Sequence, residues 1–501
     1  MTVAVRFSVA LLLASVVAIG FYRLFVAPTI ALGAPPAPLA PPTPSALSTS
    51  ALGAIGLLER DRKTDPSALV RYVNDRDAVV AARAVLAIGR LNNPAGNQTL
   101  LTVLSDSSRP DSVRAMAAFA LGLIGSQSSI DPLAGMLRGN SPAVAAMAAN
   151  ALGRIGGQPA VDALWPQLSN ADVGVREEVA VSLGEAGISG APALDYAHRK
   201  VAADTLASNI FTERDQEVRW REAWALARGY YQNEAPALRR LLTDSEELVR
   251  MYAVAGLGRL KDRTYALPIR LSANDSSWRV RVAVRDALMG LRDPTKVDIK
   301  PPKVPPSDFA QPQPVPSGAP FGAHPQVAIV TGKGVIVLEL FPDVAPYSVD
   351  NFLSLVDRGF YNNLTYFRVI ANFVVQGGDP KNTGNGGPGY SIPAELNSVP
   401  QLTGIISYGL DYDQKAMVPL VDTAGSQYYI TQSPQLHLDR GFTVFGRVVK
   451  GMAVVDAIAP QPNGNEPVDI AKQVYRCQPV TPQTDDVESK LRTAEIGYDA
   501  R

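Results

Sequence analysis

The feature that most constrains the fold is a helix-like motif that recurs along residues 51–293 at a nearly constant spacing. When the copies of the motif are aligned, one position, here called the column, recurs at intervals of 33, 31, 31, 43, 31 and 31 residues. A valine lies nine residues before the column position in every copy. Apolar residues recur at three and four positions, which is typical of an amphipathic helix. A period of this length indicates a supersecondary unit that is too small to bury its own apolar face and therefore stacks on its neighbours. The column consists of Gly89, Gly122, Gly153, Gly184, Ala227, Gly258 and Met289.

The repeated unit resembles HEAT-like repeats, in which helix pairs stack into a solenoid. The resemblance implies that residues 49–295 form an all-α scaffold that binds substrate or a protein partner and has no chemistry of its own. An alanine-rich helical bundle without solenoid order is the alternative. We expect ALGAIGLLE (51–59) to be an atypical first repeat that caps the array. The 43-residue step predicts an insertion near 202–215 that forms a loop or an extra helical turn.

An arginine directly follows the repeated valine in five of the units. Such arginines commonly form hydrogen bonds between repeats or lie on a solvated helix face, and a dedicated anion-binding groove is the alternative. Residues such as Asp244 and Ser245 lie between the helices, where caps and turns require them. The five arginines are Arg114, Arg176, Arg219, Arg250 and Arg281.

The first 33 residues have the pattern of a signal peptide or a signal anchor. Arg6 is followed by sixteen uncharged residues (7–22), whereas about 20 apolar residues normally span a bilayer. We favour an uncleaved anchor over cleavage, and a buried helix of a soluble protein is the third interpretation. Residues 34–48 follow as a Pro/Ala-rich extended linker. These features predict an exported bacterial protein that is periplasmic, possibly held in the inner membrane by residues 7–22.

Composition limits the chemistry. The chain of 501 residues has 47 basic and 47 acidic side chains, which gives no electrostatic indication of a nucleic-acid partner. One cysteine and three histidines offer neither a disulfide nor the paired spacings of a zinc site. We therefore expect no metal and no cofactor.

After the repeats, the helical spacing of apolar residues gives way to a linker and then to the alternation that is typical of strands. Residues 296–323 read as a Pro-rich, semi-extended linker that does not pack. VAIVTGKGVIVLELF (327–341) then alternates with period 2 around a turn, which predicts a hairpin. Many short strands with few helices over residues 324–477 predict a closed antiparallel β-barrel whose ends are capped by helices. Residues 478–501 are polar and are expected to be disordered. Helices are expected at 343–358 and 452–458, and further strands at 365–379, 405–408, 426–431 and 443–449.

Three motifs of this region stand in a fixed order: ELFPDVAPYSVDNFLSLVDRGFYNNLTYFRVIANFVVQGGDP, GSQYYIT and HLDRGFTVFGRVVKGMAVVDAI. Together they resemble the cyclophilin family of peptidyl-prolyl cis-trans isomerases along residues 327–476. The resemblance implies an eight-stranded barrel with a proline-binding groove on its outer face. It also implies an isomerase whose partners are proline-containing polypeptides.

When the functional residues of the family are mapped onto this sequence, the resemblance implies that Arg368 is the catalytic arginine and that Gln376 is the glutamine that orients it. Val374 takes the place of a usual methionine, His437 of a common tryptophan and Phe442 of a common histidine. We expect activity with weak binding of cyclosporin-type ligands. The substrate-binding residues that the resemblance implies are Phe373, Val374, Gln427, Tyr429, His437, Leu438, Phe442 and Gly409.

The segment 410–424 is longer than the corresponding loop of the family, and Leu410 stands where an asparagine is common. The substrate preference at that end of the groove is therefore open.

The chemistry of proline isomerisation can be argued from the residues alone. Rotation about the prolyl bond faces a barrier of about 18 to 20 kcal/mol because twisting destroys amide resonance. Lowering this barrier requires an apolar pocket for the ring, groups that hold the flanking backbone, and a donor that favours the twisted state. Arg368, Phe373, Gln376 and Tyr429 supply these types.

Several alternatives remain open. GNGGPG (384–389) formally fits a dinucleotide-binding pattern, but Pro388 and the absence of a following helix favour a plain loop. His437 is a more natural pocket wall than a proton carrier, because isomerisation moves no proton. A scaffold protein that recognises proline without turnover is the alternative to the enzyme. A lyase or chromophore-handling role is disfavoured, because no cysteine or histidine cluster accompanies the repeats.

Overall fold

The computed structural model describes residues 51–189, 196–228, 234–315, 324–413, 415, 418–458 and 470–481. They form two compact units, a helical unit and a unit built on a β-sheet, and the chain passes from the first to the second between Pro301 and Pro302. The predicted anchor (1–33) and the linker (34–48) lie outside the described residues. Within the described ranges, no helix combines the length and the apolar character needed to cross a bilayer.

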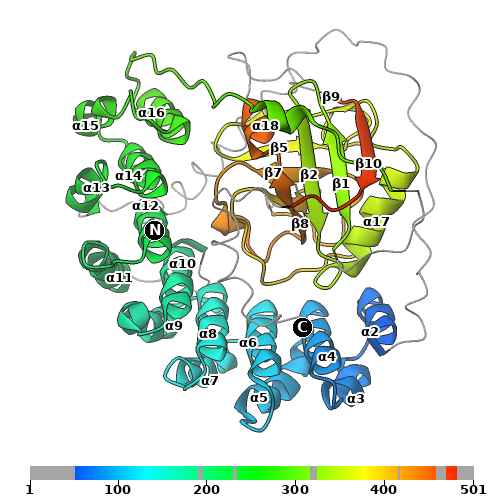
Figure 1. The fold of residues 1–501 in the computed structure, drawn as a ribbon. Helices are drawn as coiled ribbons and strands as arrows, with labels where there is room; N and C mark the ends of the chain where they lie inside the picture. The colour runs from blue at the N-terminus through cyan, green and yellow to red at the C-terminus, as the bar shows by residue number, and fades with distance from the viewer. Residues whose placement is uncertain are drawn as a thin grey trace. The chain divides into compact units, whose positions relative to one another are not determined.

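The helical unit is a solenoid of helix pairs (Figure 1). Its long helices α4, α6, α8, α10, α12, α14 and α16 pack on one another in sequence order, and another helix, shorter in all cases but α11, returns the chain between each two. This regular order confirms the solenoid and excludes the alternative of an unordered bundle. The helices are α2 Ala51–Arg60, α3 Val70–Val73, α4 Ala78–Arg90, α5 Asn97–Ser105, α6 Asp111–Ile124, α7 Ile130–Met136, α8 Pro142–Ile155, α9 Gln158–Leu164, α10 Val173–Ser189, α11 Tyr196–Asn209, α12 Gln216–Arg228, α13 Ala235–Leu241, α14 Glu247–Arg259, α15 Ala266–Leu271 and α16 Trp278–Gly290.

The glycine column allows successive long helices to approach closely. A Cβ atom on Gly122 would lie 2.8 Å from the Cα of Ala151 on the next long helix, so no side chain fits there. At one junction the arrangement is reversed: the column holds Ala227, and the facing helix has Gly256, whose added Cβ would lie 3.1 Å from the Cα of Ala227. One member of each such pair must lack a side chain because the helix axes are close. The valine nine positions earlier is buried in every repeat.

The repeated arginines mainly connect neighbouring repeats. Nη1 of Arg250 donates to the carbonyl of Asp244 at 2.8 Å, and its Nε and Nη2 donate to the carboxylate of Asp275 in the following repeat at 2.8 and 3.0 Å. Arg176 makes the same kind of pair with Glu213, at 2.7 and 3.2 Å. Hydrogen bonding between repeats, as expected, is the observed role, so these guanidinium groups do not form a separate anion groove.

The 43-residue step is accommodated by longer helices. α10 has 17 residues and α11 has 14, whereas the short helices α9 and α13 have 7 each. The insertion therefore consists of extra helical turns, one of the two forms that the sequence predicts.

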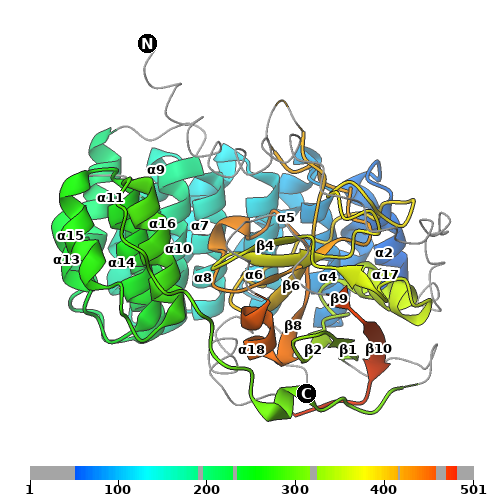
Figure 2. The ribbon, with the colours of Figure 1, turned by 90° about the horizontal axis from the view of Figure 1, so that it is seen from above.

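The second unit is built on an eight-stranded antiparallel sheet with the strand order β10-β1-β2-β8-β6-β7-β5-β4. Helices α17 (Pro346–Asp357) and α18 (Met452–Ala457) lie on opposite sides of β1 and β2 in both views (Figures 1 and 2). The expected hairpin is present, since β1 and β2 pair antiparallel around Thr331 and Gly334. The strands are β1 Gln326–Val330, β2 Val335–Leu340, β3 Leu364–Thr365, β4 Arg368–Ile370, β5 Val374–Gly377, β6 Ile405–Tyr408, β7 Tyr428–Thr431, β8 Val444–Lys450, β9 Ile470–Ala471 and β10 Gln473–Cys477.

The sheet is open, so the prediction of a closed barrel is wrong in this respect. Within the described residues, the end strands β10 and β4 do not pair with each other. Instead, the short strands that directly precede them, β9 and β3, form a separate two-stranded sheet in which Leu364 faces Ala471. The buried residues Tyr366 and Phe367 lie between β3 and β4 and belong to neither strand, so the pairing of β3 with β9 does not continue into β4.

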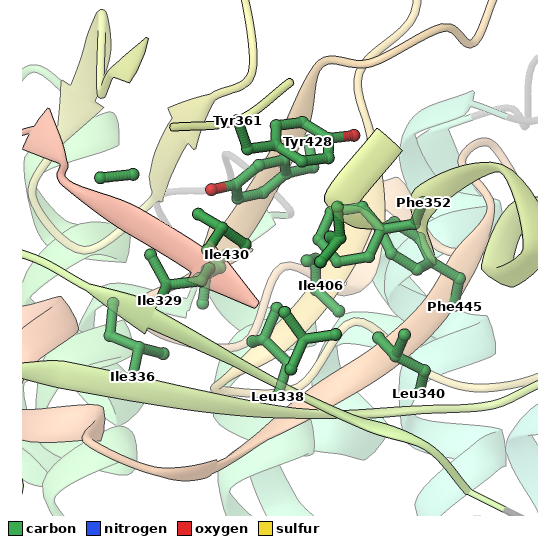
Figure 3. Packing of buried hydrophobic residues seen from close by; sticks show 14 of the residues in the cluster. Ile329, Ile336, Leu338, Leu340, Phe352, Tyr361, Ile406, Tyr428, Ile430 and Phe445 are labelled. Carbon is green, nitrogen blue, oxygen red and sulfur yellow. The ribbon is translucent and has the colours of Figure 1, made fainter. Parts of the chain in front are cut away.

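The core of this unit lies on the concave side of the curled sheet. Side chains of the strands and of α17 meet there, and the aromatic ring of Phe352 packs against Tyr361, Tyr428 and Phe445 at centroid distances of 5.0, 5.7 and 5.3 Å (Figure 3). Alternate strand residues such as Ile329 and Ile430 point into this core, so their neighbours are left for the other face of the sheet.

The Pro-rich stretch before the sheet was expected not to pack, and this expectation is wrong for part of it. Val304 packs against the core, Asp308 is 1% exposed, and the hydroxyl of Tyr475 donates to the carbonyl of Pro312 at 3.0 Å. The start of the expected disordered tail is also bound, because the N–H of Val480 donates to Oε1 of Gln326 at 2.8 Å. The residues after 481 lie outside the described part of the chain.

Candidate active site

Strand alternation explains why an arginine occurs in an apolar strand. Val369 of β4 and Val375 of β5 are buried in the core, so Arg368 and Gln376 lie on the opposite, outer face of the sheet. The register places Arg368 directly opposite Gln376, and Gln376 directly opposite Tyr429 on β7. Three neighbouring strands thus bring these side chains together.

A chain of hydrogen bonds fixes the guanidinium group. Nη1 of Arg368 donates to Oε1 of Gln376 at 3.0 Å, and Nε2 of Gln376 donates to Oε1 of Gln427 at 3.1 Å. The Arg368 guanidinium carbon lies 5.4 Å from the ring centroid of Phe373. Within the described residues these partners are neutral and Arg368 forms no ion pair, so its positive charge remains uncompensated at the site.

A glycine-rich loop fixes Gln427, the last residue in this series of hydrogen bonds. Nε2 of Gln427 donates to the carbonyls of Gly384 and Gly386 at 3.0 and 2.9 Å. The buried carboxylate of Asp379 shapes the loop by accepting from the backbone N–H groups of Lys381, at 2.6 Å, and of Thr383 and Gly384, at 2.9 and 2.6 Å. These contacts connect Asp379 to Arg368 through four consecutive interactions.

Sequence reasoning missed Asp379 and the role of this loop. GNGGPG is a loop, as predicted, and it serves to present carbonyl groups to Gln427. A Cβ atom on Gly386 would lie 1.8 Å from Oδ1 of Asp379, so a glycine is required there. An aspartate followed at short range by Asn, Thr and Gly is a turn signal that could have indicated this arrangement.

An apolar pocket adjoins Arg368. Val374, Tyr429 and Phe442 form its buried floor, with exposed fractions of 1, 4 and 8%, and Phe373 and Leu438 pack against them at the edge. The rings of Tyr429 and Phe442 meet edge to face at 5.8 Å and 80°. An apolar surface with aromatic rings of this kind suits the flat, apolar ring of proline.

The remaining predicted site residues border this pocket. His437 is exposed, and its ring stacks on Phe373 at 5.9 Å and 15° at the edge of the pocket. An added Cβ on Gly409 would lie 3.2 Å from Nε2 of Gln376 and 3.4 Å from the Cβ of Gln427, so the glycine keeps the surface open at this point. All ten residues that the sequence nominates therefore meet in one region.

Burial determines the electrostatics of the site. It lowers the pKa of Arg368 from its ordinary value, although an arginine stays protonated at neutral pH, and the nearby phenol groups of Tyr412 and Tyr429 oppose this shift. Burial also raises the pKa of Tyr429 well above its ordinary value, so this phenol stays neutral. The site therefore combines one cationic donor with neutral, largely apolar surroundings.

Comparison with known proteins identifies the family. The sequence model described as cyclophilin type peptidyl-prolyl cis-trans isomerase/CLD matches residues 326–478. A peptidyl-prolyl cis-trans isomerase of Synechococcus elongatus is 44% identical over 122 residues, which are 24% of this chain and 79% of that protein. The chain belongs to the cyclophilin-type peptidyl-prolyl cis-trans isomerases. Peptidyl-prolyl cis-trans isomerase B of Bacillus subtilis is 44% identical over 117 residues, 23% of this chain and 78% of that protein.

A crystal structure of a cyclophilin type isomerase from Cryptosporidium parvum covers 31% of this chain and 99% of its own chain, at 28% identity and a TM-score of 0.29. On the basis of the family model and the sequence relatives, the protein is a cyclophilin-type enzyme that isomerises peptidyl-prolyl bonds, and its sheet unit is the cyclophilin domain. A model of HEAT repeats matches the helical unit, which confirms the expected repeat family. Its four overlapping matches are residues 66–140, 98–184, 134–227 and 203–289.

Proposed function

We propose that the outer-face site of the cyclophilin domain is the groove in which isomerisation takes place. The pocket of Phe373, Val374, Tyr429, Leu438 and Phe442 takes the proline ring, with His437 and Gly409 at its border. Gln376 and Gln427 hold the flanking backbone and orient Arg368. The observation that carries this proposal is the hydrogen-bond chain that fixes an uncompensated guanidinium beside an apolar pocket.

The geometry suggests how the barrier is lowered. As the prolyl bond twists, amide resonance is lost and the imide nitrogen becomes pyramidal and basic. Arg368 donates to this nitrogen, or to the adjacent carbonyl, more strongly in the twisted state than in the planar one. A donor that is already oriented in a site with little water stabilises the transition state without reorganisation. The reaction moves no proton and forms no covalent intermediate.

The test is an isomerisation assay on a proline-containing peptide with wild type, Arg368→Ala and Arg368→Lys. Loss of an oriented donor should lower kcat/KM by about 10²-fold for the alanine variant. The lysine variant should recover little, because a point charge cannot match the fixed fork of the guanidinium.

Arg358→Ala, at an exposed position of the same domain, is the matched control and should retain full activity. Equal turnover in wild type and Arg368→Ala would contradict the catalytic assignment. Binding of proline peptides by a wild type without turnover would favour the alternative, a scaffold that recognises proline.

We further propose that the enzyme acts on exported polypeptides in the periplasm and that the HEAT repeats bind these substrates or a partner protein. The uncharged run 7–22 after Arg6 and the extended linker that follows it support export, with an anchor in the inner membrane as one form. The repeated, stackable helix pairs support a binding scaffold, because solenoids offer long continuous surfaces. The size of the mature chain and its fractionation with membranes distinguish an anchored from a cleaved form.

A further inference from the structure

The long segment after β6 forms a hairpin of its own. The N–H of Asp413 donates to the carbonyl of Val418 at 2.9 Å, and the N–H of Leu420 donates to the carbonyl of Asp411 at 2.7 Å. Tyr412 and Pro419 form an antiparallel bridge between these bonds. We call the described residues of 411–421 the inserted hairpin.

The base of the inserted hairpin is fixed to the rim of the groove. The N–H of Gly409 donates to the carbonyl of Gln427 at 2.8 Å. The N–H of Asp411 donates to Oγ1 of Thr423 at 3.0 Å, and this hydroxyl donates to the carbonyl of Leu420 at 2.6 Å. Because these bonds hold both arms, the position of the hairpin relative to the pocket is determined by the fold of the domain.

The inserted hairpin exposes apolar side chains. Tyr412, Val418, Leu420 and Val421 have exposed fractions of 42, 50, 40 and 53%. Among the other described residues of the cyclophilin domain, only Phe309 is a large apolar side chain with comparable exposure, at 55%. Single exposed apolar side chains are ordinary, but four within ten residues indicate a contact surface.

This surface continues the proline pocket. Leu410, at the foot of the hairpin, packs against the pocket cluster of Val374, Tyr429 and Phe442. Burial raises the pKa of Tyr412, and the charge of Arg368 opposes this shift, so the phenol lies within electrostatic reach of the guanidinium. A polypeptide seated with its proline in the pocket therefore has the hairpin beside its neighbouring residues.

We propose that the inserted hairpin is a second contact surface for the substrate and takes an apolar or aromatic side chain that flanks the proline. The proposal rests on the isomerase function of the groove. An extended chain advances about 3.3 to 3.6 Å per residue, so residues next to the proline remain at the rim of the pocket. A flanking leucine or phenylalanine loses water against the hairpin, whereas an alanine gains little. Contacts made equally in the ground state and the transition state lower KM and leave kcat unchanged.

The test uses the full-length protein and peptides in which the residue before or after proline is Ala, Leu, Phe or Asp. Wild type should have a KM three- to tenfold lower for Leu and Phe peptides than for Ala peptides, on at least one side of the proline. Both Tyr412→Ser and the double variant Val418→Ser/Val421→Ser should remove this preference, and the double variant should do so without changing kcat. The double variant is included because it leaves the neighbourhood of Arg368 intact. Phe309→Ser, an equally exposed position outside the hairpin, should leave the preference unchanged.

Other outcomes overturn the proposal. A wild type that turns over all peptides equally, or hairpin variants that keep the wild-type preference, would show that the hairpin does not contact substrate. If the variants change the sedimentation of the protein but not its peptide preference, the surface joins two copies of the chain. Absence of turnover with every peptide would instead contradict the proposed groove itself, so the two failures are distinguishable.

Discussion

At the residue scale, the site is defined by how Arg368 is held. A half-buried arginine is usually compensated by a carboxylate, but here a neutral amide and an aromatic ring are its contacts within the described residues. In the mechanism that we propose, a carboxylate would neutralise the charge that Arg368 offers to the substrate. Gln376 in turn depends on Gln427, which is fixed by the carbonyls of a loop built around Asp379.

From this series of hydrogen bonds we predict that Asp379 positions Arg368 without touching substrate. Asp379→Ala should release the loop 381–386, leave Gln427 without fixed acceptors, and lower kcat by about tenfold with a smaller effect on KM. Asp379→Asn keeps one carbonyl acceptor and should restore part of the activity. Measured kcat and KM values for the two variants check this.

A double-mutant cycle separates positioning from a general loss of stability. In a Gln427→Ala background the interaction between Asp379 and Arg368 is already cut, so Asp379→Ala should add little to the loss of kcat. If the two losses of kcat multiply in the double variant, Asp379 does not act on Arg368 through Gln427.

At the element scale, the solenoid depends on contacts between helices that leave no room for a side chain. The column glycines face alanine or serine backbones of the next long helix, and Arg176, Arg219 and Arg250 of the long helices bond to carboxylates one repeat further on. The glycine contact recurs at every junction between the long helices from α4 to α16, with its direction reversed only between α12 and α14, so each repeat stabilises its neighbours in a similar way.

Gly122→Ala should therefore destabilise the helical unit. The added methyl group would lie 2.8 Å from a backbone atom of Ala151, and overpacking of this kind costs about 1 to 3 kcal/mol in the free energy of unfolding. Gly135→Ala in α7 is the matched control, because nothing lies within 4 Å of its added Cβ and alanine favours a helix. Chemical unfolding of both variants provides the comparison; a stabilised Gly122→Ala would show that the helices can separate at no cost.

The sequence predicts the elements of both units better than their connections. Periodicity identifies the repeats, the first hairpin, α17 and the strand that carries Arg368, because local apolar spacing determines which face is buried. It does not determine which end strands pair, because that depends on contacts between residues far apart in the sequence, and within the described residues β4 and β10 do not pair. The packing of Val304 and Asp308 was missed because proline content indicates an extended chain, and an extended chain can still lie on a core.

For the candidate site, the sequence identifies the residues that belong to a motif. It does not identify residues that act on the site only through contacts made in the folded domain. Arg368, Gln376 and Tyr429 meet through strand register, and resemblance to a family is sufficient to find them. Asp379 acts through backbone N–H groups, and the inserted hairpin is a departure from the family, so neither follows from a motif.

At the scale of the whole molecule, the chain joins a cyclophilin domain to a HEAT-repeat solenoid, for which we propose a binding role. Prolyl isomerisation depends on a few residues around one bond, whereas recognition of a particular protein requires a larger area. Under this proposal, each of the two compact units carries one of the two tasks.

Removal of residues 46–300 should therefore leave kcat/KM for short peptides unchanged within about twofold and lower the refolding rate of a proline-limited protein substrate several-fold. Peptide turnover and protein refolding measured side by side with the full chain check this. If the shortened chain refolds the protein substrate as well as the full chain, the HEAT repeats have no recruiting role.

The reversed pair of Ala227 and Gly256 determines how the solenoid could grow in evolution. A tandem duplication of residues 111–141 would place Gly122 against a second copy of Ala120, the same kind of contact that Gly89 makes with Ala120 now. A duplication of residues 216–246 would instead place Ala227 against a second Ala225, with no glycine on either side. The solenoid can thus gain repeats on the N-terminal side of the contact between Ala227 and Gly256. The repeats on either side of that contact are not interchangeable with the others.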